Sequence, residues 1–142
     1  MSVLGPHLTI DGYDCPRSKL EDLELIYQVL DEFPAKIGMT KIMPPYVFRY
    51  YGKIPEKWGL SGFVLIAESH ISIHTFPEGK FLSVDIFSCT RFNPEEATSF
   101  IKETFGIKRL ETNLIERGRD YPFDLTKAQI INLEERRAIA SK

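Results

Sequence analysis

Apolar residues recur at helical spacing in the first third of the chain. They follow an S-x-x-E motif, Ser18 to Glu21, which is typical of the capping box at a helix N-terminus. The apolar positions of this face are Leu20, Leu23, Ile26, Tyr27 and Leu30. Pro34 then interrupts the pattern, so we predict a helix that begins behind Ser18 and ends at Pro34.

A second helix is indicated after residue 92. Asn93 is a good N-cap, Pro94 suits the first helical position, and two glutamates follow in the electropositive first turn. Its buried face is expected to hold Phe100, Ile101 and Phe105, and Gly106 is a natural C-terminal stop. Residues 127–138 fit either a short amphipathic helix or a mobile tail.

The remaining apolar segments are short, and several alternate between apolar and polar residues, which is typical of strands. We predict strands at 8–13, 46–51, 61–67, 70–76, 81–87 and 110–115, with turns around Trp58 and at Pro77 to Gly79. Strands joined by short turns with two helices predict an α+β fold, an antiparallel sheet with both helices on one face. The apolar run 61–67 favours a homodimer that packs sheet against sheet.

Composition narrows the class of protein. The chain has 142 residues, 43% of them hydrophobic and 27% charged, with a net charge of −2, which gives no footprint for nucleic-acid binding. No apolar run reaches the roughly 18 residues of a membrane helix, and no secretory signal is visible, so we expect a cytoplasmic protein. Of its two cysteines, Cys15 and Cys89, we expect Cys89 to stay a thiol there, free for chemistry.

Reactive side chains concentrate between Ser61 and Cys89. A strained corner at Glu68-Ser69 could press the Ser69 hydroxyl against the preceding carbonyl, so that an N→O acyl shift, followed by elimination and hydrolysis, leaves a pyruvoyl group. His74 and Ser61 are candidates for the base and the oxyanion donor that this needs. Strand parity places Ser69 and His74 on opposite faces, so either the backbone bends at the corner or a second protomer supplies the base. A metal site is not expected, because His70 and His74 would lie roughly 13 Å apart along a strand.

One ordered pattern of residues resembles a known family. It consists of Gly59-Leu60-Ser61-Gly62, the run Glu68-Ser69-His70-Ile71-Ser72-Ile73-His74-Thr75-Phe76-Pro77-Glu78, and Asp85-Ile86-Phe87-Ser88-Cys89. Gly5-Pro6-His7-Leu8 and Glu116-Arg117-Gly118 extend the likeness over about residues 5 to 118. Together they resemble the short prokaryotic S-adenosylmethionine decarboxylase proenzymes, which depend on a pyruvoyl cofactor.

The resemblance implies a role for each matching residue. Cleavage between Glu68 and Ser69 would turn Ser69 into the pyruvoyl group that forms a Schiff base with the substrate. His74 would be the processing base, Ser61 would support the oxyanion, and Cys89 would protonate the product carbon. The ribose would bind Glu78, while the aromatic residue that stacks on adenine is open among Phe48, Tyr50, Trp58 and Phe76.

The resemblance also implies an assembly and a division of the chain. We expect an α/β/β/α sandwich of two protomers, each cut into 1–68 and 69–142, in which His74 and Ser61 serve the partner's Ser69. The decarboxylase domain would span residues 1–120, and 121–142 would be a tail without an assigned role. The product would supply aminopropyl groups for spermidine synthesis. Two alternatives stay open: a pyruvoyl-dependent arginine or ornithine decarboxylase, and an unprocessed, non-catalytic dimerisation partner.

Overall fold

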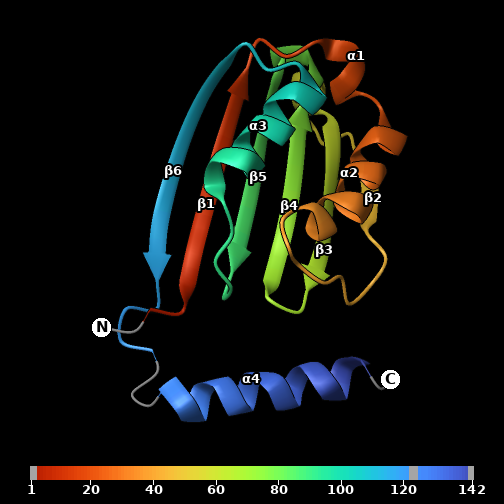
Figure 1. Ribbon diagram of the computed structural model, residues 1–142. Helices are drawn as coiled ribbons and strands as arrows, with labels where there is room; N and C mark the ends of the chain where they lie inside the picture. The colour runs from red at the N-terminus through yellow and green to blue at the C-terminus, as the bar shows by residue number, and fades with distance from the viewer. Residues whose placement is uncertain (1–2, 122–124, 141–142) are drawn as a thin grey trace.

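The computed structural model describes residues 3–121 and 125–140, with side chains of the last helix described at 130 and from 132 onward. Within these residues, six strands and four helices follow one another (Figure 1). The strands are β1 (Gly5–Tyr13), β2 (Tyr46–Tyr50), β3 (Gly59–Ile66), β4 (Ser69–Phe76), β5 (Phe81–Ser88) and β6 (Arg109–Arg117). The helices are α1 (Arg17–Leu20), α2 (Leu23–Lys36), α3 (Pro94–Phe105) and α4 (Leu125–Ala140), with 3-10 turns η1 (Pro55–Lys57) and η2 (Pro77–Gly79).

All six strands belong to one sheet, in the order β2-β3-β4-β5-β1-β6, and every neighbouring pair is antiparallel. The strands β3, β4 and β5 follow one another as hairpins, because only short turns separate them. β1 inserts between β5 and β6. The predicted α+β class is confirmed, and the first strand is longer than predicted because it begins at Gly5.

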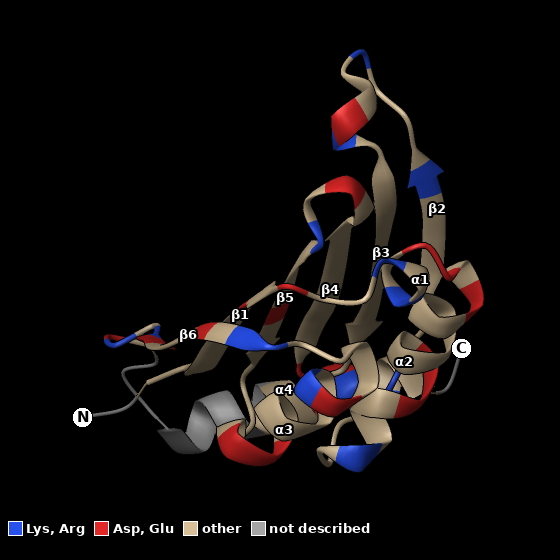
Figure 2. Cartoon of the chain, turned by 90° about the horizontal axis from the view of Figure 1, so that it is seen from above, with Lys and Arg blue, Asp and Glu red and all other residues tan. Residues whose placement is uncertain are grey.

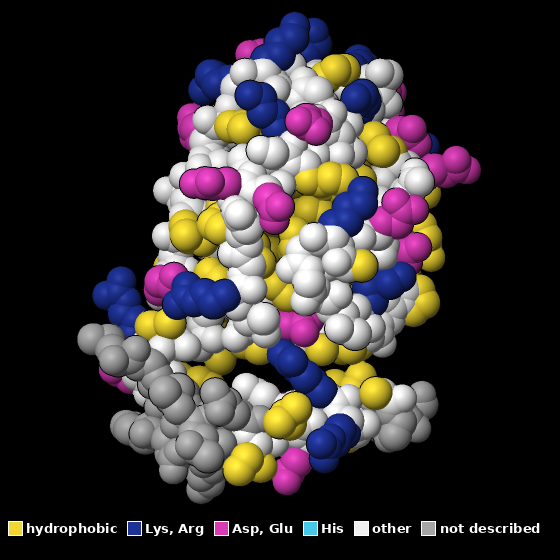
Figure 3. All heavy atoms as spheres, viewed as in Figure 1, with side chains coloured by type: hydrophobic (Ala, Val, Ile, Leu, Met, Phe, Trp, Pro, Cys, Tyr) yellow, Lys and Arg dark blue, Asp and Glu magenta, His cyan; other side chains and the backbone are white. Residues whose placement is uncertain are grey.

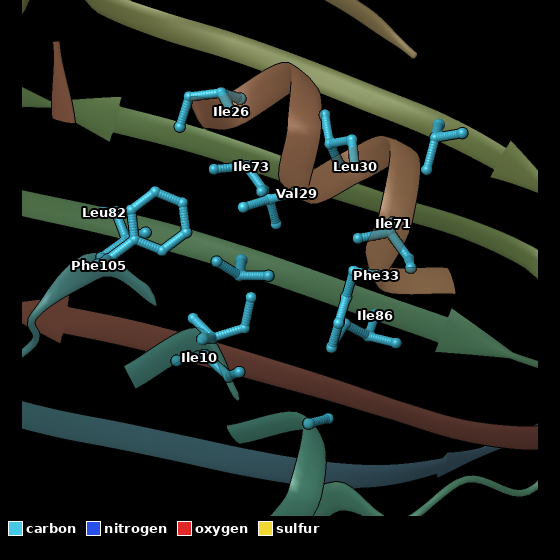
Figure 4. Packing of buried hydrophobic residues seen from close by; sticks show 14 of the residues in the cluster. Ile10, Ile26, Val29, Leu30, Phe33, Ile71, Ile73, Leu82, Ile86 and Phe105 are labelled. Atoms are coloured by element: carbon cyan, nitrogen blue, oxygen red, sulfur yellow. The ribbon is translucent and has the colours of Figure 1, made fainter. Parts of the chain in front are cut away.

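The core lies between the sheet and the helices α2 and α3, which cover the same face (Figures 1 and 4). Phe33 of α2 and Phe105 of α3 are fully buried there, and Phe33 stacks on Phe100 with ring centroids 4.8 Å apart. The strands contribute alternate residues, among them Ile10, Ile71, Ile73, Leu82 and Ile86. Each such side chain contributes about 1.5–3 kcal/mol when it leaves water, so this face holds the domain together.

The first helical region differs from the prediction. Ser18 does not cap a helix, because it lies inside the single turn α1. Glu21 pairs with Arg17 instead: Nε of Arg17 lies 3.0 Å from the Glu21 carboxylate. The cap of α2 is Asp22, which accepts a hydrogen bond from the backbone N–H of Leu25 at 3.1 Å. Pro34 lies within the last turn of α2 rather than at its end. The sequence 18–22 holds two competing caps, and the structure uses the second.

The predicted start and end of the second helix are confirmed. The Asn93 side chain accepts hydrogen bonds from the backbone N–H groups of Glu95 and Glu96, at 2.9 and 3.1 Å. At the other end Gly106 has φ of 64°, the left-handed conformation that glycine adopts without a steric penalty. Of the predicted buried face, Ile101 and Phe105 are buried and Phe100 is partly buried.

The opposite face of the sheet carries no helix within residues 3–121 and 125–140 (Figure 2). Large apolar side chains are exposed on its β2–β3 side, where Tyr46 is 59% and Leu65 42% exposed. Phe48, Tyr50 and Phe63 share this face. We refer to it as the open face. In the part of the chain that the structure describes, no helix is long and apolar enough to cross a membrane.

The C-terminal segment forms the helix α4, which lies across one end of the sheet (Figure 1). This is the end where β5 finishes and where the turn between β3 and β4 lies. The helix alternative for the tail is therefore confirmed, over a longer range than predicted. Its position matters because the predicted cleavage site, Glu68-Ser69, lies in that turn.

Candidate active site

The peptide bond between Glu68 and Ser69 lies in the tight turn that joins β3 to β4. The carbonyl oxygen of Glu68 accepts a hydrogen bond of 2.8 Å from the backbone N–H of Cys89, directly after β5. A donor at this oxygen stabilises the negative charge that develops when the carbonyl carbon is attacked. The Ser69 φ is 157°, a positive value that is uncommon for a residue other than glycine.

The side chain of Glu68 is buried, with 4% of its surface exposed. One carboxylate oxygen accepts a hydrogen bond of 3.0 Å from the backbone N–H of Thr40, and the other lies 3.5 Å from the guanidinium of Arg136 in α4. A buried carboxylate is costly unless it is paired in this way. These contacts fix the residue on the acyl side of the candidate scissile bond.

Cys89 is partly exposed and is held by close packing against the first strand. A Cβ atom on Gly5 would lie 1.9 Å from the carbonyl oxygen of Ser88 and 2.7 Å from Cα of Cys89, so only glycine permits this approach. Since Ser88 pairs with Ser69 across β4 and β5, the thiol-bearing residue lies beside the start of β4. The structure therefore brings Glu68, Ser69 and Cys89 together.

A second cluster is formed by Ser61 and His74. These residues are register partners in β3 and β4, and the Ser61 hydroxyl lies 2.9 Å from Nδ1 of His74 on the open face. His74 lies five residues beyond Ser69 in the same strand, about 16 Å along it and on the opposite face. Within one chain the structure does not bring this pair to Ser69.

The predicted substrate-binding residues lie at the far end of β4 from Ser69. The Glu78 carboxylate accepts two hydrogen bonds from Arg17, at 3.0 and 2.6 Å, and one of 3.1 Å from Nε1 of Trp58. Phe76 contacts Phe81, with ring centroids 5.7 Å apart. Of the other aromatic candidates, Phe48 and Tyr50 lie on the open face. Within one chain, the length of β4 separates Glu78 from Ser69.

Two features were missed by the sequence analysis. One is Arg136, which the sequence presents only as part of the mixed charge run 134–137. The other lies on the open face, where Nε2 of His7 is 3.2 Å from the Asp85 carboxylate and the His7 ring lies 6.5 Å from that of His70. Burial, and then the neighbouring His7, lower the pKa of His70, which favours its neutral form. The alternation of side chains along β1, β4 and β5 could have predicted that His7, His70 and Asp85 share one face.

The strands form one antiparallel sheet, and the carbonyl oxygen of the residue before Ser69 accepts a backbone hydrogen bond. The family model described as S-adenosylmethionine decarboxylase matches residues 6–118, which include every strand from β2 to β6 and all of β1 except its first residue. The chain belongs to the S-adenosylmethionine decarboxylase family, a family of carboxy-lyases. The helix α4 lies beyond the matched residues.

Individual relatives agree with this assignment. The chain is 35% identical over 120 residues to the S-adenosylmethionine decarboxylase proenzyme of Clostridium botulinum strain Hall, covering 84% of this chain and 98% of the relative. It is 32% identical over 136 residues to the proenzyme of the same name from Thermococcus kodakarensis, covering 95% and 91%. Because that alignment covers 95% of this chain, it extends into α4.

A solved structure supports the same fold. The crystal structure of the adenosylmethionine decarboxylase from Aquifex aeolicus superposes with a TM-score of 0.69 at 32% identity. The match covers 83% of this chain and 93% of the other. The likeness therefore extends over the whole sheet-and-helix body rather than over a local motif.

Proposed function

We propose that this chain cleaves itself between Glu68 and Ser69 and then decarboxylates S-adenosylmethionine, supplying an aminopropyl donor for spermidine synthesis. The observation that carries this proposal is the hydrogen bond of 2.8 Å from the backbone N–H of Cys89 to the carbonyl oxygen of Glu68. It polarises the one carbonyl that Ser69 would attack. The family, whose relatives are named proenzymes, supplies the reaction class.

Self-cleavage would begin when the Ser69 hydroxyl oxygen adds to the Glu68 carbonyl carbon. The C–N bond breaks as the C–O ester bond forms, and the hydroxyl proton passes to the new amine. Removal of the α-proton of Ser69 then breaks its Cβ–O bond and releases the Glu68 carboxylate. Water hydrolyses the remaining dehydroalanine, which releases ammonia and leaves a pyruvoyl group. The Cys89 N–H stabilises the oxyanion of the first step.

The surroundings of Ser69 fit a small uncharged acyl group, because the residue is partly buried at the start of β4 and Cys89 follows its register partner, Ser88. Once formed, a pyruvoyl group supplies an electron sink for decarboxylation of an amine-bearing substrate. In the proposed site the Cys89 thiol donates the proton that replaces carbon dioxide. A cytoplasmic, reducing compartment fits a site that depends on a free thiol.

Substrate binding is proposed at Glu78, with Phe76 or Trp58 against the adenine. A carboxylate offers about four acceptor positions, and three of those on Glu78 are used by Arg17 and Trp58. To accept hydrogen bonds from both ribose hydroxyls, Glu78 must therefore lose a bond to Arg17 or Trp58. These donors would fix the orientation of the carboxylate until the substrate arrives.

A homodimer would bring the Ser61–His74 pair of one chain close to Ser69 of the other. Packing the open faces of two sheets would cover the exposed aromatic and aliphatic side chains of β2 and β3. In an antiparallel arrangement, the Ser61–His74 pair of one protomer could lie near the Ser69 corner of the other. His74 would then act as the processing base for the partner chain, giving the α/β/β/α sandwich expected from the sequence.

Complementation tests this arrangement in trans. Chains with His74→Ala and chains with Ser69→Ala are each expected to stay uncut when produced alone. When they are co-expressed with different tags, the His74→Ala chain should be cut, because the Ser69→Ala partner supplies its His74. Intact mass of each tagged chain measures the outcome. Cleavage of His74→Ala alone, or no cleavage in the mixture, would contradict the shared site.

The substrate is tested by carbon dioxide release from carboxyl-labelled S-adenosylmethionine, arginine and ornithine. We expect release from S-adenosylmethionine only, together with two fragments, Met1–Glu68 and Ser69–Lys142, the second lighter by one ammonia than a chain that begins with serine. Release from arginine or ornithine instead would assign the alternative substrate. One intact chain with no release would favour the non-catalytic dimerisation partner.

A further inference from the structure

The helix α4 lies outside the residues matched by the family model, yet it contacts the candidate cleavage site. Its Arg136 guanidinium lies 3.5 Å from the Glu68 carboxylate, 3.1 Å from Oγ1 of Thr90 and 3.9 Å from Sγ of Cys89. We propose that Arg136 is a positioning residue for self-cleavage, because it holds Glu68 against Cys89. This inference rests on the proposed function and assigns a role to the C-terminal helix.

The geometry of the corner supports this role. Glu68 lies on the acyl side of the candidate scissile bond, at the end of the β3–β4 turn, whereas Cys89 and Thr90 follow β5. Between these two segments runs the hydrogen bond from the Cys89 N–H to the Glu68 carbonyl oxygen. Arg136 contacts both segments at once. Arg136 therefore holds the Cys89 N–H and the Glu68 carbonyl in the alignment that polarises this carbonyl.

The charges of Glu68 and Arg136 favour the same role for Arg136. The Glu68 carboxylate is 4% exposed, and its second oxygen lies beside the guanidinium. If Arg136 lost its charge, the carboxylate would keep the hydrogen bond from the Thr40 N–H but lose its positive partner, and turning outward to water would become favourable. With its side chain no longer anchored, the turn at Glu68 would hold the carbonyl less firmly against the Cys89 N–H.

Among the described side chains of α4, Arg136 makes the charged contact to the corner and lies between two cavities. Two cavities of about 330 Å³ flank Arg136: one between α4 and Ala67-Glu68, the other between α4 and Cys89-Thr90. Figure 3 shows the corresponding hollow between α4 and the body of the domain. Because the surroundings are open, replacing Arg136 should change the corner without unfolding the sheet.

The experiment compares cleavage rates of newly synthesised full-length chains by intact mass. Arg136→Gln is expected to slow cleavage about tenfold, the effect of losing one charge-assisted contact. Arg137→Gln is the matched control, because Arg137 is the exposed next residue of α4, and it should cleave at the wild-type rate. Arg136→Lys, which keeps the charge, should cleave faster than the glutamine variant.

A double-mutant cycle separates positioning from a general structural effect. If Arg136 acts through Glu68, Glu68→Gln slows cleavage and adding Arg136→Gln slows it little further. Equal rates for Arg136→Gln and Arg137→Gln, full additivity with Glu68→Gln, or a lysine variant as slow as the glutamine variant would overturn the inference. A wild-type chain that stays uncut would instead refute the proposed function, so the two failures are distinguishable.

Discussion

Ser69→Ala is expected to give a single uncut chain of 142 residues without decarboxylase activity. Alanine lacks the hydroxyl that attacks the Glu68 carbonyl, and the Cys89 N–H that polarises this carbonyl cannot cleave the bond by itself. Without cleavage there is no pyruvoyl group, so the loss of turnover should be complete rather than partial. Denaturing electrophoresis and intact mass measure cleavage, and carbon dioxide release measures turnover, all on one preparation.

The matched control is Ser99→Ala, which removes an exposed hydroxyl from α3 on the opposite side of the sheet from the open face. It should be cut and active like the wild type. The thermal midpoint of the uncut Ser69→Ala protein should show that it still folds. Turnover in a homogeneous Ser69→Ala preparation would show that the electron sink does not come from this residue.

Cys89→Ala is expected to be cut normally but to lose at least about 100-fold in turnover, the usual contribution of a positioned general acid. The substitution removes the thiol but keeps the backbone N–H, so the donor to the Glu68 carbonyl survives. Processing and turnover should therefore separate in this variant. Fragment formation by intact mass and carbon dioxide release provide the two readouts.

Cys15→Ala is the matched control for this thiol. Cys15 is buried at 1% exposure, and burial raises its pKa to about 11, so its thiol stays protonated and out of reach of substrate. The control should keep both cleavage and turnover. A Cys89→Ala enzyme with the wild-type rate would show that another group donates the proton, and an uncut one would show that the thiol itself takes part in cleavage.

The strands of the site were predictable because their signals are local. The alternation from His70 to Phe76 and the turn at Pro77 determine β4 to within a residue. The tight turn before Ser69 also fixes the register, and with it the pairing of Ser61 with His74. By contrast, serine and aspartate both favour N-cap positions, and Ser18 and Asp22 lie close together in the sequence. The structure uses Asp22, and Leu20 between them is fully buried.

The contact between Arg136 and Glu68 could not be predicted in the same way. The two residues are far apart in the sequence, and no pattern in the run 134–137 indicates which surface of the domain the last helix covers. Likewise, parity shows that Ser69 and His74 lie on opposite faces, but it does not show how a second chain would bring them together. Where a helix or a second chain packs against the sheet depends on tertiary contacts, and the spacing of apolar residues along the sequence does not encode these.

The first strand, β1, lies between β5 and β6, which would hold together the two pieces of a chain cut as proposed. β1, β2 and β3 precede residue 68, whereas β4, β5 and β6 follow it. Since β1 lies between β5 and β6, and β3 pairs with β4, the strands of the two polypeptides interleave across three ladders. Separating the two pieces would break these three ladders, so we expect a chain cut as proposed to stay one folding unit until denaturant unfolds the sheet.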